Sequence, residues 1–255
     1  MTLAFHPRVA VASLSGESDA AWARQATPHV GAAFLGGIAL DDPTRDAARE
    51  LVERDRNEFL PEDPLSFIDR QLAALEDEPL LAGFNVRTTS IEPLREAARI
   101  CRDRDAVLEV NAHCRQAELC SVGAGEALLA DTDRLCRYVE AAADEEAMVS
   151  VKIRTEVDGV DLPATASAVV EAGAAAVHVD AMDSEWVVAD VVSAVEEEGG
   201  ATVIANNGVR NRTTVTEYLE YGADAVSVGR PSDDPRVLDR VGQATEGWFS
   251  REVRP

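Results

Sequence analysis

The stretch MVSVKIRTEVDGVDLPATASAVVEAGAAAVHVDA (148–181) decides the fold. It opens with an apolar, β-branched run (148–154), continues as an amphipathic segment of helical period that ends in Gly (162–173), and returns to an apolar run (175–181). A glycine after the last periodic residue is a common helix stop. Strand, helix and strand in this order are typical of a βα unit in a parallel sheet.

The same unit recurs along the whole chain. The other strand-like runs are RVAVAS (8–13), VGAAFL (30–35), LLAGFNV (80–86), AVLEVNA (106–112), TVIANN (202–207) and AVSVGR (225–230). Eight strands in about 250 residues, each followed by a helical segment, predict an α/β protein with the (β/α)8 TIM-barrel fold. A doubly wound sheet usually has fewer strands, and no G-x-G-x-x-G follows the first run.

No Pro/Gly/Ser-rich linker interrupts the pattern, so we expect a single barrel domain over residues 1–255. A helical insertion is predicted at about 41–78, between the second and third strands. It contains two helical segments, DDPTRDAAREL (41–51) and PLSFIDRQLAALED (64–77). After the eighth run there is room for one closing helix.

The chain is strongly acidic, with 47 Asp or Glu against 24 Lys or Arg and a formal net charge of -23. Lys152 is its only lysine. This composition predicts a halophilic protein, because self-repulsion is screened when the Debye length falls to about 3 Å at 1 M salt. It excludes a basic nucleic-acid arm. The apolar fraction of 46% is enough for a folded core.

The chain carries no recognisable metal, disulfide or targeting motif. Its four cysteines form no C-x-x-C pair, so we expect reduced thiols and no metal site. No apolar run approaches 18 residues and no signal peptide is evident. These features predict a cytoplasmic protein without a membrane partner.

Polar side chains on the strands point to a site at one end of the barrel, where the carboxyl ends of the strands form the active sites of this fold. Glu109 and Asn111 alternate on the fourth strand, Lys152 and Arg154 on the fifth, and His178 lies on the sixth. The simplest alternative is that Glu109, Lys152 and Arg154 neutralise one another. Against it, a chain that otherwise uses Arg has kept one Lys here, and a compact ammonium is not interchangeable with a guanidinium.

Glycines after the last two strands indicate a phosphate site. The seventh strand ends in Asn206-Asn207-Gly208 and the eighth in Gly229-Arg230. In this fold these two loops commonly bind phosphate through backbone N–H groups. Tight turns alone would also explain a single glycine, but glycines at both places favour phosphate binding.

Five segments, in the right order, resemble the tRNA dihydrouridine synthases. The segment VNAHCRQAELCSVGAGEALLAD (110–131) resembles their Asn, two residues, Cys-Pro, Gly-Ala-Gly and Leu-Leu pattern. The others are VASLSGESD (11–19), VKIRT (151–155), VIANNGV (203–209) and GADAVSVGRP (222–231). The resemblance implies an FMN-dependent oxidoreductase that reduces a C=C bond of a pyrimidine substrate or a tRNA uridine, with NADPH or NADH as electron donor.

The resemblance also implies roles for individual residues. Lys152 would contact the polar edge of the isoalloxazine and stabilise the reduced, anionic flavin. The residues expected to bind the cofactor are Ser13, Asn85, Asn111, Lys152, His178, Asn206, Gly208, Gly229 and Arg230. The family's proton-donating cysteine falls on Cys114, and an ordinary thiol is mostly protonated at neutral pH. His113 is the rival proton donor, because an imidazole titrates near pH 6.5. Cys101 and Cys136 fall in helical segments and are expected in the core.

The sequence also departs from the family pattern. His113 and Arg115 flank the cysteine where the family has Gly and Pro, and Asp180 stands where the family has His. The helical tRNA-binding domain that follows the barrel in the synthases is not expected in this chain. Two alternatives stay open: a phosphate-binding lyase or isomerase that uses Lys152 without flavin, and a barrel without catalysis that serves as a scaffold.

Overall fold

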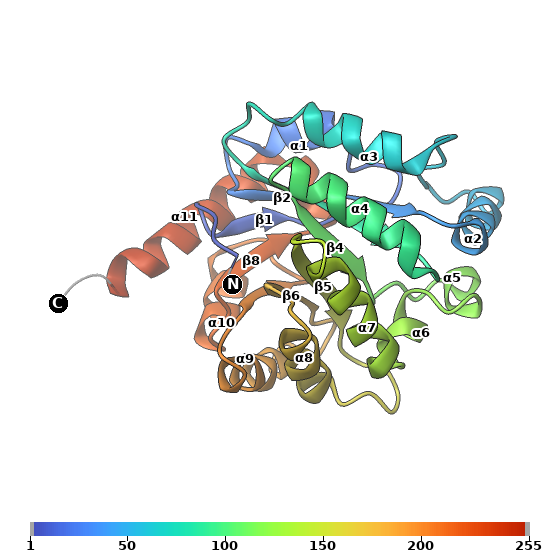
Figure 1. Ribbon diagram of the computed structural model, residues 1–255. Coiled ribbons are helices and arrows are strands. Elements are labelled where there is room, and N and C mark those ends of the chain that lie inside the picture. Colours follow the sequence, from blue (N-terminus) through green and yellow to red (C-terminus); the bar gives the residue numbers. More distant parts are fainter. Residues whose placement is uncertain (1–2, 253–255) are drawn as a thin grey trace.

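The computed structural model describes residues 3–252, and its strands coincide with the apolar runs. The strands are β1 (Val9–Val11), β2 (Ala32–Ala39), β3 (Leu81–Arg87), β4 (Val107–Asn111), β5 (Met148–Arg154), β6 (Ala176–Asp180), β7 (Thr202–Asn206) and β8 (Ala225–Val228). Sequential neighbours pair in parallel and β8 pairs with β1, so the sheet is a closed barrel. The predicted (β/α)8 fold is confirmed (Figure 1).

Helices connect the strands and form the outer layer. They are α1 (Ala20–Ala26), α2 (Asp42–Glu53), α3 (Pro64–Ala73), α4 (Ile91–Asp103), α5 (Ala117–Ser121), α6 (Glu126–Leu129), α7 (Thr132–Ala143), α8 (Leu162–Glu171), α9 (Val187–Glu197), α10 (Arg212–Glu220) and α11 (Pro235–Glu252). A short 3-10 helix, Arg230–Asp233, lies between β8 and α11. Figure 1 shows α11 extending away from the barrel.

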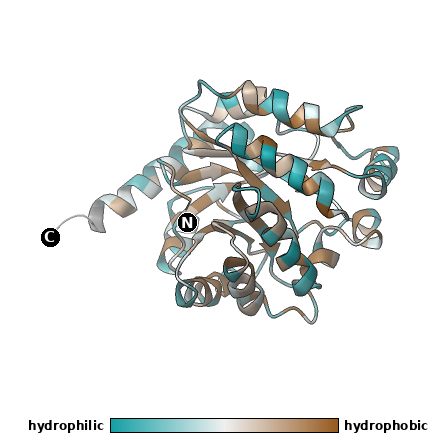
Figure 2. Cartoon of the chain, viewed as in Figure 1, coloured by the Kyte–Doolittle hydropathy of each residue, from teal (hydrophilic) through white to brown (hydrophobic). Residues whose placement is uncertain are grey.

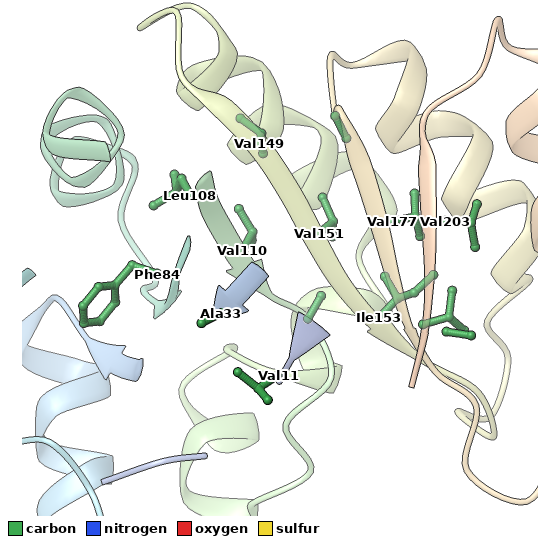
Figure 3. Packing of buried hydrophobic residues seen from close by; sticks show 14 of the residues in the cluster. Val11, Ala33, Phe84, Leu108, Val110, Val149, Val151, Ile153, Val177 and Val203 are labelled. Carbon is green, nitrogen blue, oxygen red and sulfur yellow. The ribbon is translucent and has the colours of Figure 1, made fainter. Parts of the chain in front are cut away.

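The alternation along each strand separates an outer core from the barrel interior. Val149, Val151 and Ile153 on β5 belong to the core between sheet and helices, and Figure 3 shows such side chains with Leu108 and Val110 of β4. Branched apolar residues at alternate positions suit a sheet whose outer face is covered by helices. Brown and teal residues accordingly alternate along the helices in Figure 2.

Inside the barrel the filling changes from apolar to polar along the axis. Toward the amino ends of the strands it consists of alanine, branched aliphatic and aromatic side chains: Ala10, Ala32, Phe34, Val107, Ala176, Ile204 and Ala225, with Leu3 packed against them. Toward the carboxyl ends the same alternation places Asn85, Glu109, Lys152 and His178, all buried, inside the barrel. Polar groups are therefore concentrated at the carboxyl end, where this fold has its active sites.

Two helices, α2 and α3, lie between β2 and β3, as the sequence predicts. Each begins with an aspartate N-cap and a proline in its first turn, which favours helix initiation there. Ala47 and Leu51 of α2 pack against Leu119 and Ala124 in a small apolar cluster. This contact joins the insertion to the segment that follows β4.

Candidate active site

The strand register brings the predicted polar residues into adjacent positions. Asn111 of β4 lies beside Lys152 of β5, and Lys152 lies beside His178 of β6. Asn85 of β3 lies beside Glu109 of β4. Neighbouring strands are about 4.8 Å apart, so these side chains, drawn from four strands, form one group at the carboxyl end of the barrel.

Glu109 is the centre of this group and is fully buried. Its Oε2 lies 2.7 Å from His178 Nδ1, and its Oε1 accepts a hydrogen bond of 2.7 Å from Asn85 Nδ2. His178 Nε2 lies 2.7 Å from Ser227 Oγ. Burial by itself raises the pKa of Glu109, but the neighbouring His178 and Lys152 bring that pKa below its ordinary value. Glu109 is therefore a carboxylate at neutral pH.

His178, which the sequence analysis expects to contact the cofactor, is buried inside the barrel. It is fully buried, and both ring nitrogens have protein partners. Burial and the Lys152 charge lower its pKa, an effect that Glu109 only partly offsets. Neutral imidazole thus bridges Glu109 and Ser227. Asn85 is also fully buried and lies in the same layer, so neither residue presents an exposed atom to a ligand.

Asn111 connects this layer to the loop that carries the predicted proton donors. Its Nδ2 donates to Asn85 Oδ1 at 2.7 Å, and its Oδ1 accepts from the backbone N–H of Cys114 at 3.1 Å. The backbone N–H of His113 donates to the same oxygen at 3.4 Å. The asparagine side chain therefore closes the turn after β4.

Lys152 is a buried residue without a direct ion pair, although its charge is near enough to Glu109 to lower the pKa of that carboxyl. Its side chain is 2% exposed, and among residues 3–252 its Nζ makes neither a hydrogen bond nor an ion pair. Glu109 pairs with His178, and Arg154 lies 3.6 Å from Glu126 of α6. Glu109, Lys152 and Arg154 therefore form no direct ion pairs with one another, unlike in the alternative that they simply neutralise one another. An ammonium in a buried residue that makes no direct hydrogen bond or ion pair would favour an anionic or strongly polar ligand.

Cys114 lies, partly exposed, on the loop after β4, and contacts with Gly125, Glu126 and an apolar cluster hold it in place. Glu126 N–H donates to the Cys114 carbonyl at 2.9 Å. Gly125, at φ +61°, lies so close that a Cβ there would be 2.1 Å from that carbonyl oxygen. Cys114 also packs against the apolar cluster of α2 and α5. The family-like Gly-Ala-Gly (123–125) therefore fixes the position of the cysteine.

His113, the rival donor, is partly buried, and its Nδ1 is buried without a hydrogen-bond partner. Burial, reinforced by the Lys152 charge, lowers the pKa of His113 well below its ordinary value. His113 is therefore neutral at pH 7, and a neutral imidazole is a poor source of a proton. This environment favours Cys114 over His113 as the acid.

The two glycine loops lie side by side at the ends of β7 and β8. Asn206 Nδ2 donates to the Ser227 carbonyl at 3.0 Å and ties the loops together. A Cβ on Gly208 or on Gly229 would meet nothing within 4 Å, so the space above both backbones is open. Arg230 is exposed at the start of the 3-10 helix. Open backbone and an arginine are suited to an anion, and the Gly208 N–H, which donates to Asn207 Oδ1 at 3.0 Å, would have to exchange that partner for the ligand.

The structure adds Arg87 and Glu58, which the sequence analysis missed. Arg87 ends β3, and its Nη1 lies 2.7 Å from Glu58 Oε2, with both side chains almost completely buried. Arg87 also donates to Ser15 Oγ, whereas the predicted Ser13 is partly buried in the same loop after β1. The only available signal was the position of Arg87 at the end of a strand. Glu58 comes from the segment between α2 and α3 and carries no motif.

Other features lie away from this group. Cys101 is fully buried in α4, where burial raises its pKa to about 12, and Cys136 is partly buried in α7. Two surface cavities, of about 770 Å³ at the amino end of the barrel and about 450 Å³ between α10 and α11, contain none of the predicted site residues. Within residues 3–252, no helix is long and apolar enough to span a bilayer.

Comparison with known proteins gives a family and a fold. The family described as dihydrouridine synthase (Dus) matches residues 68–254. An uncharacterised protein of Methanocaldococcus jannaschii is 26% identical over 228 residues, which is 88% of each chain. The tRNA-dihydrouridine synthase B of Xanthomonas axonopodis pv. citri is 27% identical over 235 residues; the match covers 88% of this chain but 65% of that synthase.

Among solved structures, DHODH of Eimeria tenella in complex with ferulenol has a TM-score of 0.69 at 15% identity, covering 98% of this chain and 83% of that one. The 3-hexulose-6-phosphate synthase of Salmonella typhimurium has a TM-score of 0.56 at 15% identity, covering 94% of this chain and 98% of that one. At such identities these likenesses show the barrel fold alone.

Proposed function

The chain belongs to the dihydrouridine synthase family, and from this premise we propose that it is an FMN-dependent oxidoreductase that reduces the C=C bond of a pyrimidine, either free or as a uridine in tRNA. NADPH or NADH is the proposed electron donor. The observation that carries the proposal is Lys152, the only lysine of the chain, buried without a direct ion pair at the carboxyl end of β5.

The residues at the carboxyl end fit FMN in chemical character. The proposed contacts for the ring system are Lys152 and Asn111, with Ser13 at the neighbouring loop. The open backbones at Gly208 and Gly229, together with Arg230 and Asn206, would bind the phosphate. Asp180 does not contradict this arrangement, because its carboxylate accepts from the N–H of Met182, at 3.5 Å, and is only partly buried.

When bound, FMN supplies the hydride that adds to one carbon of the substrate double bond. Lys152 would place a positive charge at the polar edge of the ring system. Its ammonium makes no direct ion pair with the protein, so it would stabilise negative charge on the ring. Cys114 would donate the proton to the other carbon, from the loop that Asn111 and Gly125 hold in place. The resemblance to the family implies that this proton would arrive on the side of the substrate opposite the hydride.

The single lysine makes a direct test possible. In the absence of ligand, Lys152 and the terminal amine are the only amines that an amine-selective acylating reagent can modify, and tryptic peptides distinguish the two. We expect FMN, titrated in molar potassium chloride, to bind with quenched fluorescence and to protect Lys152 from acylation. Lys152→Met should weaken FMN binding by at least tenfold, on the order of one lost charge-assisted hydrogen bond.

Failure of FMN to bind in high salt would contradict the proposal. Borohydride trapping of a carbonyl substrate on Lys152 would instead favour the lyase or isomerase class, for which an unpaired buried lysine is also suited. Glu145→Gln is a control for the acylation assay, because Glu145, in the turn after α7, forms its ion pairs with Arg95 and Arg99 of α4.

A further inference from the structure

One chain of hydrogen bonds crosses the barrel beneath the proposed flavin site. It runs from Ser227 of β8 through His178 of β6 to Glu109 of β4. From Glu109 it continues through Asn85 of β3 and Asn111 of β4 to the backbone of Cys114. Every link except the last measures 2.7 Å, and the link from Asn111 to the Cys114 N–H measures 3.1 Å.

The carboxylate of Glu109 dictates the direction of every link. An ionised carboxylate can only accept, so His178 must carry its proton on Nδ1 and Asn85 must present its amide NH2 group. The carbonyl of Asn85 then faces Asn111 and accepts from the Asn111 NH2 group. The carbonyl of Asn111 is consequently turned toward the Cys114 loop. The branch through His178 and the arm through Asn85 therefore both donate hydrogen bonds to the Glu109 carboxylate.

The backbone N–H groups of Cys114 and His113 fix the far end of the arm, because they can only donate to Asn111 Oδ1, and Glu109 is the acceptor that completes this direction. His178 and both asparagines carry a donor and an acceptor, so each can be reversed if its neighbours reverse. Lys152 and His178 are the titratable groups that face Glu109, and neither is an acceptor for the arm that leads to Asn111. Burying the carboxylate is costly, whereas an apolar residue, such as Val107 one layer below, fills the barrel at no electrostatic cost.

We infer that Glu109 is a positioning residue for the proton-donating loop: by fixing the orientation of the Asn85 and Asn111 amides, its carboxylate holds the backbone at Cys114 in place. The assignment of Cys114 as the acid rests on the proposed function, but the positioning itself does not. Glu109 touches neither substrate nor cofactor, since it is fully buried under Lys152 and Asn111. Glu109 acts on the Cys114 loop through the side-chain amides of Asn85 and Asn111.

The experiment measures how freely the Cys114 thiol reacts in flavin-free protein. Trypsin places each of the four cysteines on a separate peptide, with Cys114 on 105–115 and Cys136 on 135–137. The alkylation rate of Cys114 relative to Cys136 can therefore be followed by mass spectrometry in molar salt. We expect Glu109→Gln to raise this ratio about tenfold, because an amide oxygen accepts from Asn85 more weakly than a carboxylate does, and the amide NH2 group is satisfied only if His178 moves its proton to Nε2.

Two further variants separate positioning from general destabilisation. Glu109→Asp keeps the charge and should stay closer to the parent protein than Glu109→Gln does. Glu145→Gln is the same chemical change at a carboxylate that pairs with Arg95 and Arg99 on α4, and it should leave the ratio unchanged. A folded Glu109→Gln protein whose ratio stays within twofold of the parent would overturn the inference.

A measurement on the unaltered protein covers the case in which Glu109→Gln does not fold. Residue-resolved hydrogen exchange should find the Cys114 amide protected, because it donates to Asn111 Oδ1, and the exposed Arg115 amide fast. Equal exchange at both amides would overturn the inference. Both readouts use protein without flavin, so failure of FMN binding leaves them interpretable, and their failure leaves the FMN titration interpretable.

Discussion

Glu58 Oε2 lies 2.7 Å from Arg87 Nη1, and both side chains are almost completely buried although the residues belong to different elements. Glu58 comes from the segment between α2 and α3, and Arg87 ends β3. Gly16, at φ +72°, packs so closely on this segment that a Cβ would lie 2.5 Å from the backbone of Asn57. The insertion is thereby fixed to the carboxyl end of the barrel and becomes part of the wall of the candidate site.

Removing one partner of this buried pair should be strongly destabilising. We expect Glu58→Gln to lower the free energy of unfolding by about 3–5 kcal/mol, because the Arg87 charge stays buried without its counter-ion. Glu78→Gln, which breaks the half-exposed pair with Arg24, should cost about 0–1 kcal/mol. Urea unfolding in constant salt measures both. Equal losses for the two variants would mean that burial does not govern the Glu58–Arg87 pair.

Cys114→Ala should separate flavin chemistry from substrate chemistry. Flavin binding and its reduction by a nicotinamide should stay nearly intact, whereas the step in which substrate is reduced should slow by about 10² to 10⁴ for loss of a general acid. His113→Ala should retain that step, because the buried His113 is neutral at pH 7. Stopped-flow absorbance of the two half-reactions checks this. The reverse result would assign the proton to His113.

Gly125→Ala should displace the Cys114 loop. The added Cβ would collide with the Cys114 carbonyl oxygen, and φ +61° is strained for any L side chain. The expected cost is about 1–3 kcal/mol in stability, together with loss of substrate reduction. Gly159→Ala is the matched control, because φ is +77° there but a Cβ meets nothing within 4 Å. The difference between the two thermal melts isolates the collision, and identical melts would exclude it.

Stability should fall as the pH drops below about 6.5. The pKa of His113 is lowered in the folded protein, so the unfolded chain binds more protons than the folded one below its own histidine pKa. Each such histidine contributes a slope of up to about 1.4 kcal/mol per pH unit between the unfolded and folded pKa values. His113→Asn should remove one contribution. Unfolding curves between pH 7 and 5 in constant high salt test this, and parallel profiles for parent and variant would contradict it.

The net charge of -23 predicts that stability depends on salt. The Debye length is about 30 Å at 0.01 M and about 3 Å at 1 M, so repulsion among surface carboxylates is screened only at high salt. Thermal melts in millimolar potassium chloride should therefore occur at lower temperature than melts in molar potassium chloride. Sodium sulfate at matched ionic strength is a useful comparison for separating screening from salt-specific effects. An unchanged melting temperature would remove the halophilic interpretation.

The sequence predicted the strands and the grouping of polar residues inside the barrel because both depend on local pattern. Apolar residues at alternate positions require a covered sheet face, and the polar residues between them, such as Lys152 of β5 and Asn111 of β4, must then face the interior. The order of eight such runs leaves few topologies other than a closed barrel.

The tertiary structure alone decided which group the Glu109 carboxylate contacts. Glu109 could have formed an ion pair with Lys152 or Arg154, yet its carboxylate is hydrogen-bonded to the neutral His178, which lies 69 residues away in the chain. That choice depends on strand register and barrel closure, which bring β3, β4, β6 and β8 around one axis. Glu58 carries no motif, because its role follows from where the insertion packs. A sequence specifies which groups must be buried, whereas their partners are set by distances that exist only once the barrel has closed.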